Sequence, residues 1–191
     1  MVDLRSWKVL ERKSLLNKTP WFHVWCETVQ LPDGRVVEDY YKIEGLEGVV
    51  VVALTPDRQV ITESHYKHGI GEITLDFPRG YIDPGEAPIF AAKRELLEET
   101  GYKSKQWISL GRYVLDASRG FGAANIFLAL NAGQDSEEIF SNDLEDTCVN
   151  LMQFEEVLKA VFDGEVKEIA VATAILLANQ HLYGNLREDV Y

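Results

Sequence analysis

The sequence has few cysteines, no excess of positive charge and no long apolar run. Its 191 residues include two cysteines, Cys26 and Cys148, and 19 basic against 31 acidic side chains, a net charge of −12. Two cysteines give no disulfide framework, and an acidic chain is unsuited to a broad nucleic-acid or anionic-membrane surface. No apolar run could span a bilayer, and residues 1–13 lack the apolar core of a signal peptide. We therefore expect a soluble cytoplasmic protein without nucleic-acid or membrane partners.

Length and composition are those of an ordinary globular domain, with 46% hydrophobic and 26% charged residues. A chain of this length can bury a core within one domain. We predict a single domain over residues 1–191. Residues 1–45 would form a β-rich N-terminal extension, and residues 46–191 would form the core.

The hydrophobic pattern predicts strands that surround one central helix and then end in two further helices. The predicted strands are Trp7 to Leu16, Phe22 to Leu31, Arg35 to Ile43, Val49 to Leu54, Gln59 to Tyr66, Glu72 to Phe77, Trp107 to Leu115, Asn125 to Asn131 and Cys148 to Met152. The Pro32-Asp33-Gly34 segment is typical of a hairpin turn. The last two helices are predicted at Phe154 to Phe162 and Glu168 to Leu182. This order favours a mixed sheet between helical layers.

The most informative segment is GYIDPGEAPIFAAKRELLEETGY, from Gly80 to Tyr102. Pro88 suits the first turn of a helix, and Gly101 suits its left-handed end. Between them stand alanine, lysine, arginine, leucine and glutamate, which are strong helix formers. The segment therefore predicts a helix between two glycine-containing loops.

Three glutamates of this helix share one face. Glu95, Glu98 and Glu99 are spaced at i, i+3 and i+4, and Arg94 can pair with Glu98 four residues later. The apolar residues expected on the opposite side, against the sheet, are Ile89, Phe90, Leu96 and Leu97. Clustered carboxylates repel each other unless a cation lies among them, and hard oxygen ligands suit Mg²⁺ or Mn²⁺. The alternative is a solvated acidic helix face.

The spacing of this segment resembles the Nudix box, Gx5Ex7REUxEExGU, with U an aliphatic residue. The matching residues are Gly80, Glu86, Arg94, Glu95, Glu98, Glu99 and Gly101, while Tyr102 stands in the last U position. The resemblance implies an α/β/α sandwich with a mixed sheet. It also implies Mg²⁺-dependent hydrolysis of a diphosphate linked to a nucleoside or a similar group.

The resemblance also assigns roles within the box. Glu95, Glu98 and Glu99 would bind the metal together with a backbone carbonyl of Arg79 or Gly80. In a separate role, Arg94 would hold the glutamates in place and Glu86 would tie the loop to the helix; for these two residues a simple ion pair is the alternative. For the general base we favour Glu145 in the loop before the last strand, with Asp143 second. A solvated acidic loop is the alternative there.

Substrate residues are also implied by resemblance. FPRGYIDPGE, from Phe77 to Glu86, is similar to the lead-in of ADP-ribose and nucleoside diphosphate sugar pyrophosphatases. In that group an aromatic-arginine pair stands where this chain has Tyr66-Lys67, and a tryptophan that stacks on adenine corresponds to Trp21. The substrate-binding residues that we expect are Trp21, Tyr66, Lys67, Arg79 and Arg119. Trp21 as a core or interface residue and Arg119 as a surface residue are the alternatives.

One departure concerns substrate choice. ADP-ribose pyrophosphatases commonly carry a proline after the box, and here Asp116 stands near that place. The implied function is still hydrolysis of ADP-ribose or a related nucleoside diphosphate sugar by a homodimer. A GDP-mannose-type hydrolase, a dinucleoside polyphosphate hydrolase and a non-catalytic ADP-ribose-sensing module stay open as alternatives.

Overall fold

The computed structural model describes residues 5–135 and 147–184, which form two compact units. The first unit comprises the N-terminal residues through Glu47 together with Val114–Ala123. The second unit comprises Gly48–Tyr113 and the described residues from Ala124 onward. Each unit is described by itself below.

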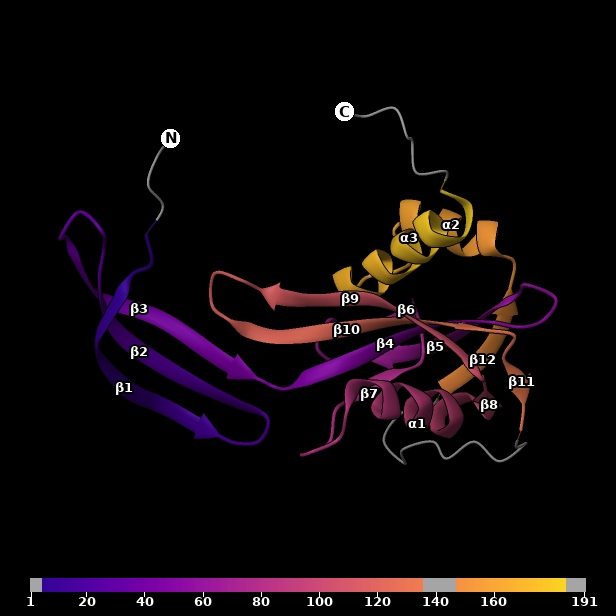
Figure 1. The fold of residues 1–191 in the computed structure, drawn as a ribbon, viewed down its shortest axis with the longest axis horizontal. Coiled ribbons are helices and arrows are strands. Elements are labelled where there is room, and N and C mark those ends of the chain that lie inside the picture. Colours follow the sequence, from indigo (N-terminus) through magenta and orange to yellow (C-terminus); the bar gives the residue numbers. More distant parts are fainter. Residues whose placement is uncertain (1–4, 136–146, 185–191) are drawn as a thin grey trace. The chain divides into compact units, whose positions relative to one another are not determined.

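The first unit is built on a three-stranded antiparallel sheet in the order β1-β2-β3 (Figure 1). Its strands are β1 (Lys8–Lys18), β2 (Phe22–Gln30) and β3 (Val36–Gly45). The predicted turn between β2 and β3 is confirmed, and Gly34 takes the left-handed φ of 92° that the turn requires. Residues 114–123 are held to this sheet because Ile43 N–H donates to the Arg119 carbonyl at 2.9 Å.

The second unit is a seven-stranded mixed sheet with helices on both faces (Figure 1). Its elements are β4 (Glu47–Leu54), β5 (Val60–Lys67), β6 (Glu72–Asp76), β7 (Arg79–Tyr81), α1 (Pro88–Thr100), β8 (Tyr102–Lys103), β9 (Gln106–Asp116), β10 (Phe121–Leu130), β11 (Gly133–Gln134), β12 (Thr147–Met152), α2 (Phe154–Phe162) and α3 (Ile169–Tyr183). The sheet order is β12-β5-β4-β10-β9, with β6 paired to β5 and β7 paired to β4; β8 and β11 form a separate small ribbon. The α/β/α sandwich expected from the sequence is confirmed.

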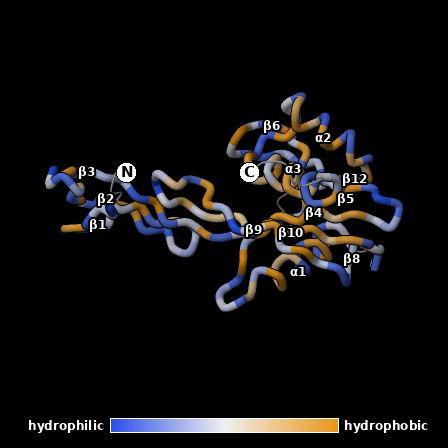
Figure 2. The backbone as a smooth tube through the Cα atoms, turned by 45° about the horizontal axis from the view of Figure 1, so that its top comes forward, coloured by the Kyte–Doolittle hydropathy of each residue, from blue (hydrophilic) through white to orange (hydrophobic). Residues whose placement is uncertain are grey.

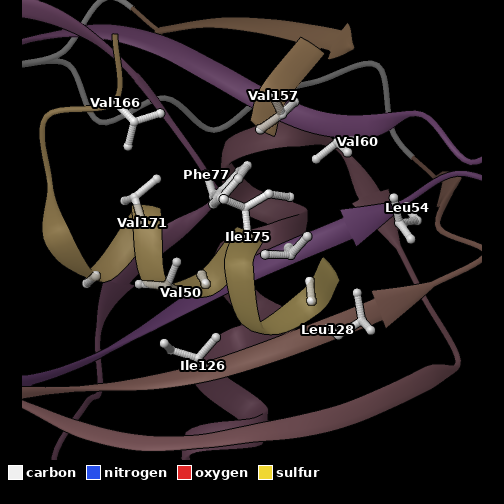
Figure 3. Packing of buried hydrophobic residues seen from close by; sticks show 14 of the residues in the cluster. Val50, Leu54, Val60, Phe77, Ile126, Leu128, Val157, Val166, Val171 and Ile175 are labelled. Atoms are coloured by element: carbon white, nitrogen blue, oxygen red, sulfur yellow. The ribbon is translucent and has the colours of Figure 1, made fainter. Parts of the chain in front are cut away.

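Two hydrophobic cores lie on opposite faces of this sheet, because side chains alternate along β4. Val50, Val52 and Leu54 face α2 and α3, while Val49 and Val51 belong to the core beneath α1. Figure 2 shows hydrophobic residues concentrated along β4 and β10. In Figure 3, Phe77 and Ile175 meet between the sheet and α3. Helix α1 is therefore held against the sheet by one of these two cores.

The structure confirms the predicted elements with shifts of a few residues at their ends, and it adds the short strands β7, β8 and β11. One packing prediction is wrong: Phe90 does not pack on the sheet, since it is 60% exposed. The neighbouring turn of the helix instead buries Ala91 and Ala92. Both cysteines are free thiols. None of the helices in the described part of the chain has both the length and the hydropathy needed to cross a bilayer.

Candidate active site

Helix α1 carries the residues of the predicted site. It starts with Pro88 at its first turn and ends at Gly101, whose φ of 75° is left-handed and whose N–H donates to the Leu97 carbonyl at 2.8 Å. Leu96 is completely buried against the sheet. This anchoring fixes the rotation of the helix, so that Glu95 faces the sheet while Glu98 and Glu99 are partly exposed.

Arg94 organises the carboxylates around it. Its Nη1 lies 2.6 Å from Glu95 Oε1 and 3.3 Å from Glu98 Oε2, while its Nε and Nη2 donate to the two oxygens of Glu86 at 3.3 and 3.0 Å. Nη2 also donates to the Tyr81 carbonyl at 2.9 Å. The hydrogen bond from Arg94 lowers the pKa of Glu86, and Glu86 in turn raises that of Arg94. One guanidinium thus ties the loop before the helix to two glutamates on the helix.

Glu86 also accepts the Asp83 N–H at 3.1 Å, which closes the loop that leads into α1. Gly80, at the other end of this loop, lies against Glu95. A Cβ at Gly80 would lie 2.1 Å from Glu95 Oε1. Only glycine therefore leaves room for this carboxylate.

Glu99 is held by the backbone of β7, since Arg79 N–H donates to Glu99 Oε2 at 2.8 Å. Burial, followed by the charge of Glu63, raises the pKa of Glu99 to about 9. Burial also raises the pKa of Glu95, against the opposing effect of Arg94. Without a cation, burial therefore disfavours the charged forms of Glu99 and Glu95.

Charged residues on the sheet beneath α1 were not predicted from the sequence. Ile61 belongs to the core under this helix, so alternation along β5 places Glu63, His65 and Lys67 on the same face. His65 Nε2 lies 2.8 Å from Asp76 Oδ2, and Arg79 Nε lies 3.0 Å from that same oxygen. All of Glu63, His65 and Asp76 are buried. The signal for Glu63 and His65 in the sequence was the run of ionisable residues at every second position of β5, a strand that is otherwise mostly buried.

The donors around α1 fit a hard divalent cation. They are carboxylates, together with the backbone of the loop at Gly80, where the missing Cβ leaves space beside Glu95. In the described part of the chain, no group of three or more His, Cys, Asp or Glu side chains is close enough to hold an ion as it stands. Arg94 engages one oxygen of Glu95 and one of Glu98, and the Arg79 N–H engages one oxygen of Glu99. The second oxygen of each of these glutamates could contact a cation while these hydrogen bonds hold the carboxylates in place.

The predicted substrate residues fall in both units. In the first unit, Trp21 is 61% exposed just before β2, and Arg119 Nη1 lies 3.2 Å from Asp116 Oδ2. In the second unit, Tyr66 is half exposed and Lys67 Nζ lies 3.9 Å from Asp76 Oδ2. The Arg79 guanidinium pairs with Asp76 and Glu168. The predicted base residues Glu145 and Asp143 lie outside the described residues.

Helix α1, its arginine clamp and its place on a mixed sheet define a Nudix domain. The family model for the NUDIX domain matches residues 46–170, and the chain belongs to the Nudix family. It is therefore an enzyme, a Nudix hydrolase. A second model, the nucleoside diphosphate sugar hydrolase N-terminal domain, matches residues 7–43.

Two curated relatives match over nearly the whole chain. The chain is 28% identical to an ADP-ribose pyrophosphatase of Bacillus subtilis (strain 168), over 88% of this chain and 92% of that protein. It is 25% identical to the ADP compounds hydrolase NudE of Escherichia coli (strain K12), over 94% of this chain and 98% of that protein. A crystal structure of an ADP compounds hydrolase shares the fold, with a TM-score of 0.82 at 24% identity, covering 96% of this chain and 98% of that one.

Proposed function

We propose that this enzyme hydrolyses the diphosphate bond of ADP-ribose or a related nucleoside diphosphate sugar in the presence of Mg²⁺. The products would be a nucleoside monophosphate and a sugar phosphate. The observation that carries the proposal is the clamp of Arg94 on Glu86, Glu95 and Glu98 within a complete box. The names of the two relatives, both of which act on ADP compounds, support the substrate class.

The cation would be held by Glu95, Glu98 and Glu99 together with a backbone carbonyl of Arg79 or Gly80. When bound, Mg²⁺ or Mn²⁺ neutralises the diphosphate and lowers the pKa of a water molecule. The protein's own contribution is placement, because Arg94 fixes Glu95 and Glu98 while the Arg79 N–H fixes Glu99. Glu86 supports Arg94 from the loop side. Preorganised carboxylates reduce the reorganisation needed when substrate arrives.

The proton of the attacking water needs an acceptor. We propose Glu145 for this role, with Asp143 as the alternative, because a carboxylate on a loop can approach the substrate from outside the helix. Glu145→Gln is expected to lower turnover strongly and leave the affinity for Mn²⁺ nearly unchanged. Asp143→Asn, measured in parallel, ranks the two acids of this loop as candidates for the base. A Glu145→Gln variant with wild-type turnover would return the base role to α1.

The substrate contacts are proposed from exposure and charge. Tyr66 is half exposed beside Lys67, so the pair can present a ring and an ammonium group to a nucleotide. Trp21 presents an exposed indole suited to stacking on a base. The Arg79 guanidinium is already paired with Asp76 and Glu168, so we assign it chiefly to positioning the loop. Arg119 would have to leave Asp116 to contact a phosphate.

A homodimer is part of the proposal. The first unit exposes many large apolar side chains on a three-stranded sheet, which a second copy of this chain would cover. These side chains are Trp7, Val9, Leu10, Leu15, Leu16, Trp21, Phe22, Val36 and Tyr41. The match of residues 7–43 to the N-terminal domain of nucleoside diphosphate sugar hydrolases supports a role for this segment in the same function.

A substrate panel tests the proposal. The values of kcat/KM are measured for ADP-ribose, GDP-mannose, UDP-glucose and diadenosine polyphosphates under one set of conditions with Mg²⁺ and with Mn²⁺. We expect ADP-ribose to rank first. If it ranks tenfold or more below another compound, about 1.4 kcal/mol of transition-state binding, the ADP-ribose assignment is wrong although the diphosphate chemistry stands. Binding of ADP-ribose without cleavage of any compound would favour a sensing module.

A further inference from the structure

Glu63 is a buried carboxylate without a hydrogen-bond partner among the described residues. Its side chain is completely inaccessible to solvent, and neither of its oxygens accepts a hydrogen bond from residues 5–135 or 147–184. The neighbouring acidic side chains, in contrast, have hydrogen-bond and ion-pair partners. Asp76 binds His65, Arg79 and the Phe77 N–H, and Glu95 binds Arg94. A buried carboxylate without such partners is strongly destabilising, so its presence requires a physical reason.

The position of Glu63 places it at the base of the site. It lies in the middle of β5, opposite Asp76 of β6 and Val149 of β12, on the face that α1 covers. The charges that act on it come from Asp76, Lys67, Arg79 and Glu95, and its own charge acts on Glu99. Glu63 therefore belongs to the same electrostatic cluster as the glutamates of α1.

The nearby cations do not neutralise Glu63 by direct contact. Arg79 is within ion-pair distance of Asp76 and Glu168, and Lys67 Nζ is 3.9 Å from Asp76. Arg94 is engaged by the glutamates of the box. A small cation that entered from the α1 side would meet Glu63 at no cost in hydrogen bonds. In Glu95, Glu98 and Glu99, by contrast, one carboxylate oxygen is already engaged, by Arg94 in the first two and by the Arg79 N–H in the third.

We propose that Glu63 is a further metal-binding carboxylate, which together with Glu99 holds a divalent cation between the sheet and α1. This inference rests on the proposed function, since it requires the box to bind a divalent cation. Carboxylate oxygens at this site select a hard ion of the Mg²⁺ or Mn²⁺ class. The unpartnered oxygens are then ligand atoms, and the burial of Glu63 excludes water from one side of the ion.

The test is direct binding of Mn²⁺ without substrate, measured by calorimetry and by the electron paramagnetic resonance signal of free Mn²⁺. The wild-type protein is compared with Glu63→Gln, which keeps the shape of the side chain and removes its charge. The matched control is Glu27→Gln, a buried glutamate of β2 in the other unit whose Oε1 forms an ion pair with Arg12 at 2.6 Å. Glu63→Asp, which keeps the charge on a shorter side chain, is the second variant.

We expect Glu63→Gln to bind Mn²⁺ on the order of tenfold or more weakly, or to lose one bound ion. Glu27→Gln should bind as the wild type does, and Glu63→Asp should bind more tightly than Glu63→Gln. In EDTA, Glu63→Gln should melt at or above the wild-type temperature, because glutamine is buried uncharged without having to take up a proton. Wild-type stoichiometry and Kd in a folded Glu63→Gln variant would overturn the proposal. Should Glu63→Gln not fold, wild-type Kd and stoichiometry in a folded Glu63→Ala variant would overturn it equally. Since no substrate is used, these outcomes are independent of the ADP-ribose assignment.

Discussion

Replacing Gly80 by alanine should damage catalysis far more than stability. The added Cβ would lie 2.1 Å from Glu95 Oε1 and 2.3 Å from its carboxyl carbon, where ordinary contact begins at 3.4 Å. Because the φ of Gly80 is outside the left-handed region, the backbone itself accepts alanine. The clash is therefore relieved at the end of a flexible side chain, and the Glu95 carboxylate moves by about 1.3 Å.

The displaced carboxylate is the one that Arg94 Nη1 contacts at 2.6 Å and that we assign to the metal. A misplacement of about 1 Å in a catalytic group costs roughly 100-fold in rate, or about 2.7 kcal/mol of transition-state stabilisation. The loss of one hydrogen bond, about 1 kcal/mol, is largely offset by the lower backbone entropy that alanine gives the unfolded chain. We therefore expect a nearly unchanged melting temperature together with a large loss of activity.

The assay is kcat/KM for ADP-ribose with Mg²⁺, measured beside thermal unfolding in EDTA. Gly133→Ala in β11 is the matched control, because a Cβ there has no atom within 4 Å and its φ is likewise outside the left-handed region. This control should keep wild-type activity. A Gly80→Ala variant within threefold of the wild-type kcat/KM would refute the reasoning that the position of Glu95 governs catalysis.

Three further predictions follow from the same geometry. Arg94→Lys should lower kcat/KM by about 10- to 100-fold and also lower the melting temperature, since one ammonium group cannot hold Glu86, Glu95 and Glu98 together; wild-type kinetics would contradict the clamp. In EDTA the melting temperature should fall as pH rises from about 4.5 to 9. The pKa of Glu63 is raised from 4.5 to about 8 and that of Glu99 from 4.5 to about 9. The folded state therefore binds more protons than the unfolded state across this window, and its stability decreases as pH rises. Mg²⁺ should reduce this fall, and a melting temperature that rises across the window would contradict the assigned burial. Light scattering at micromolar concentration should give a dimer, and a monomer would contradict the interface proposed for the first unit.

The sequence predicts the framework of this enzyme well, because its signals are local. The box helix is bounded by Pro88 and Gly101, whose backbone preferences mark its start and end, and the hairpin is marked by Pro32-Asp33-Gly34. Helix α2 coincides with the predicted Phe154 to Phe162. The short strands β7, β8 and β11 were missed because two or three residues carry no periodicity.

The position of the charged residues on the sheet beneath α1 could not be predicted in the same way. Glu63, His65 and Asp76 read as ordinary strand residues, and their role depends on which face of β5 and β6 is covered by α1. Pairing between distant strands decides that face. The prediction that Phe90 packs on the sheet was wrong for a related reason. Its helix buries small alanines against the sheet, which leaves the phenyl ring outside the contact.

We propose that the glutamates of α1 bind the divalent cation with which this enzyme cleaves a diphosphate. The most direct measurement separates and quantifies the products of ADP-ribose after incubation with wild-type protein and with Glu99→Gln, in Mg²⁺, in Mn²⁺ and in EDTA. We expect AMP and ribose 5-phosphate from the wild type with either metal, no turnover in EDTA, and turnover lower by orders of magnitude in folded Glu99→Gln. Equal turnover in EDTA, or wild-type turnover by Glu99→Gln at saturating Mg²⁺, would contradict the proposal.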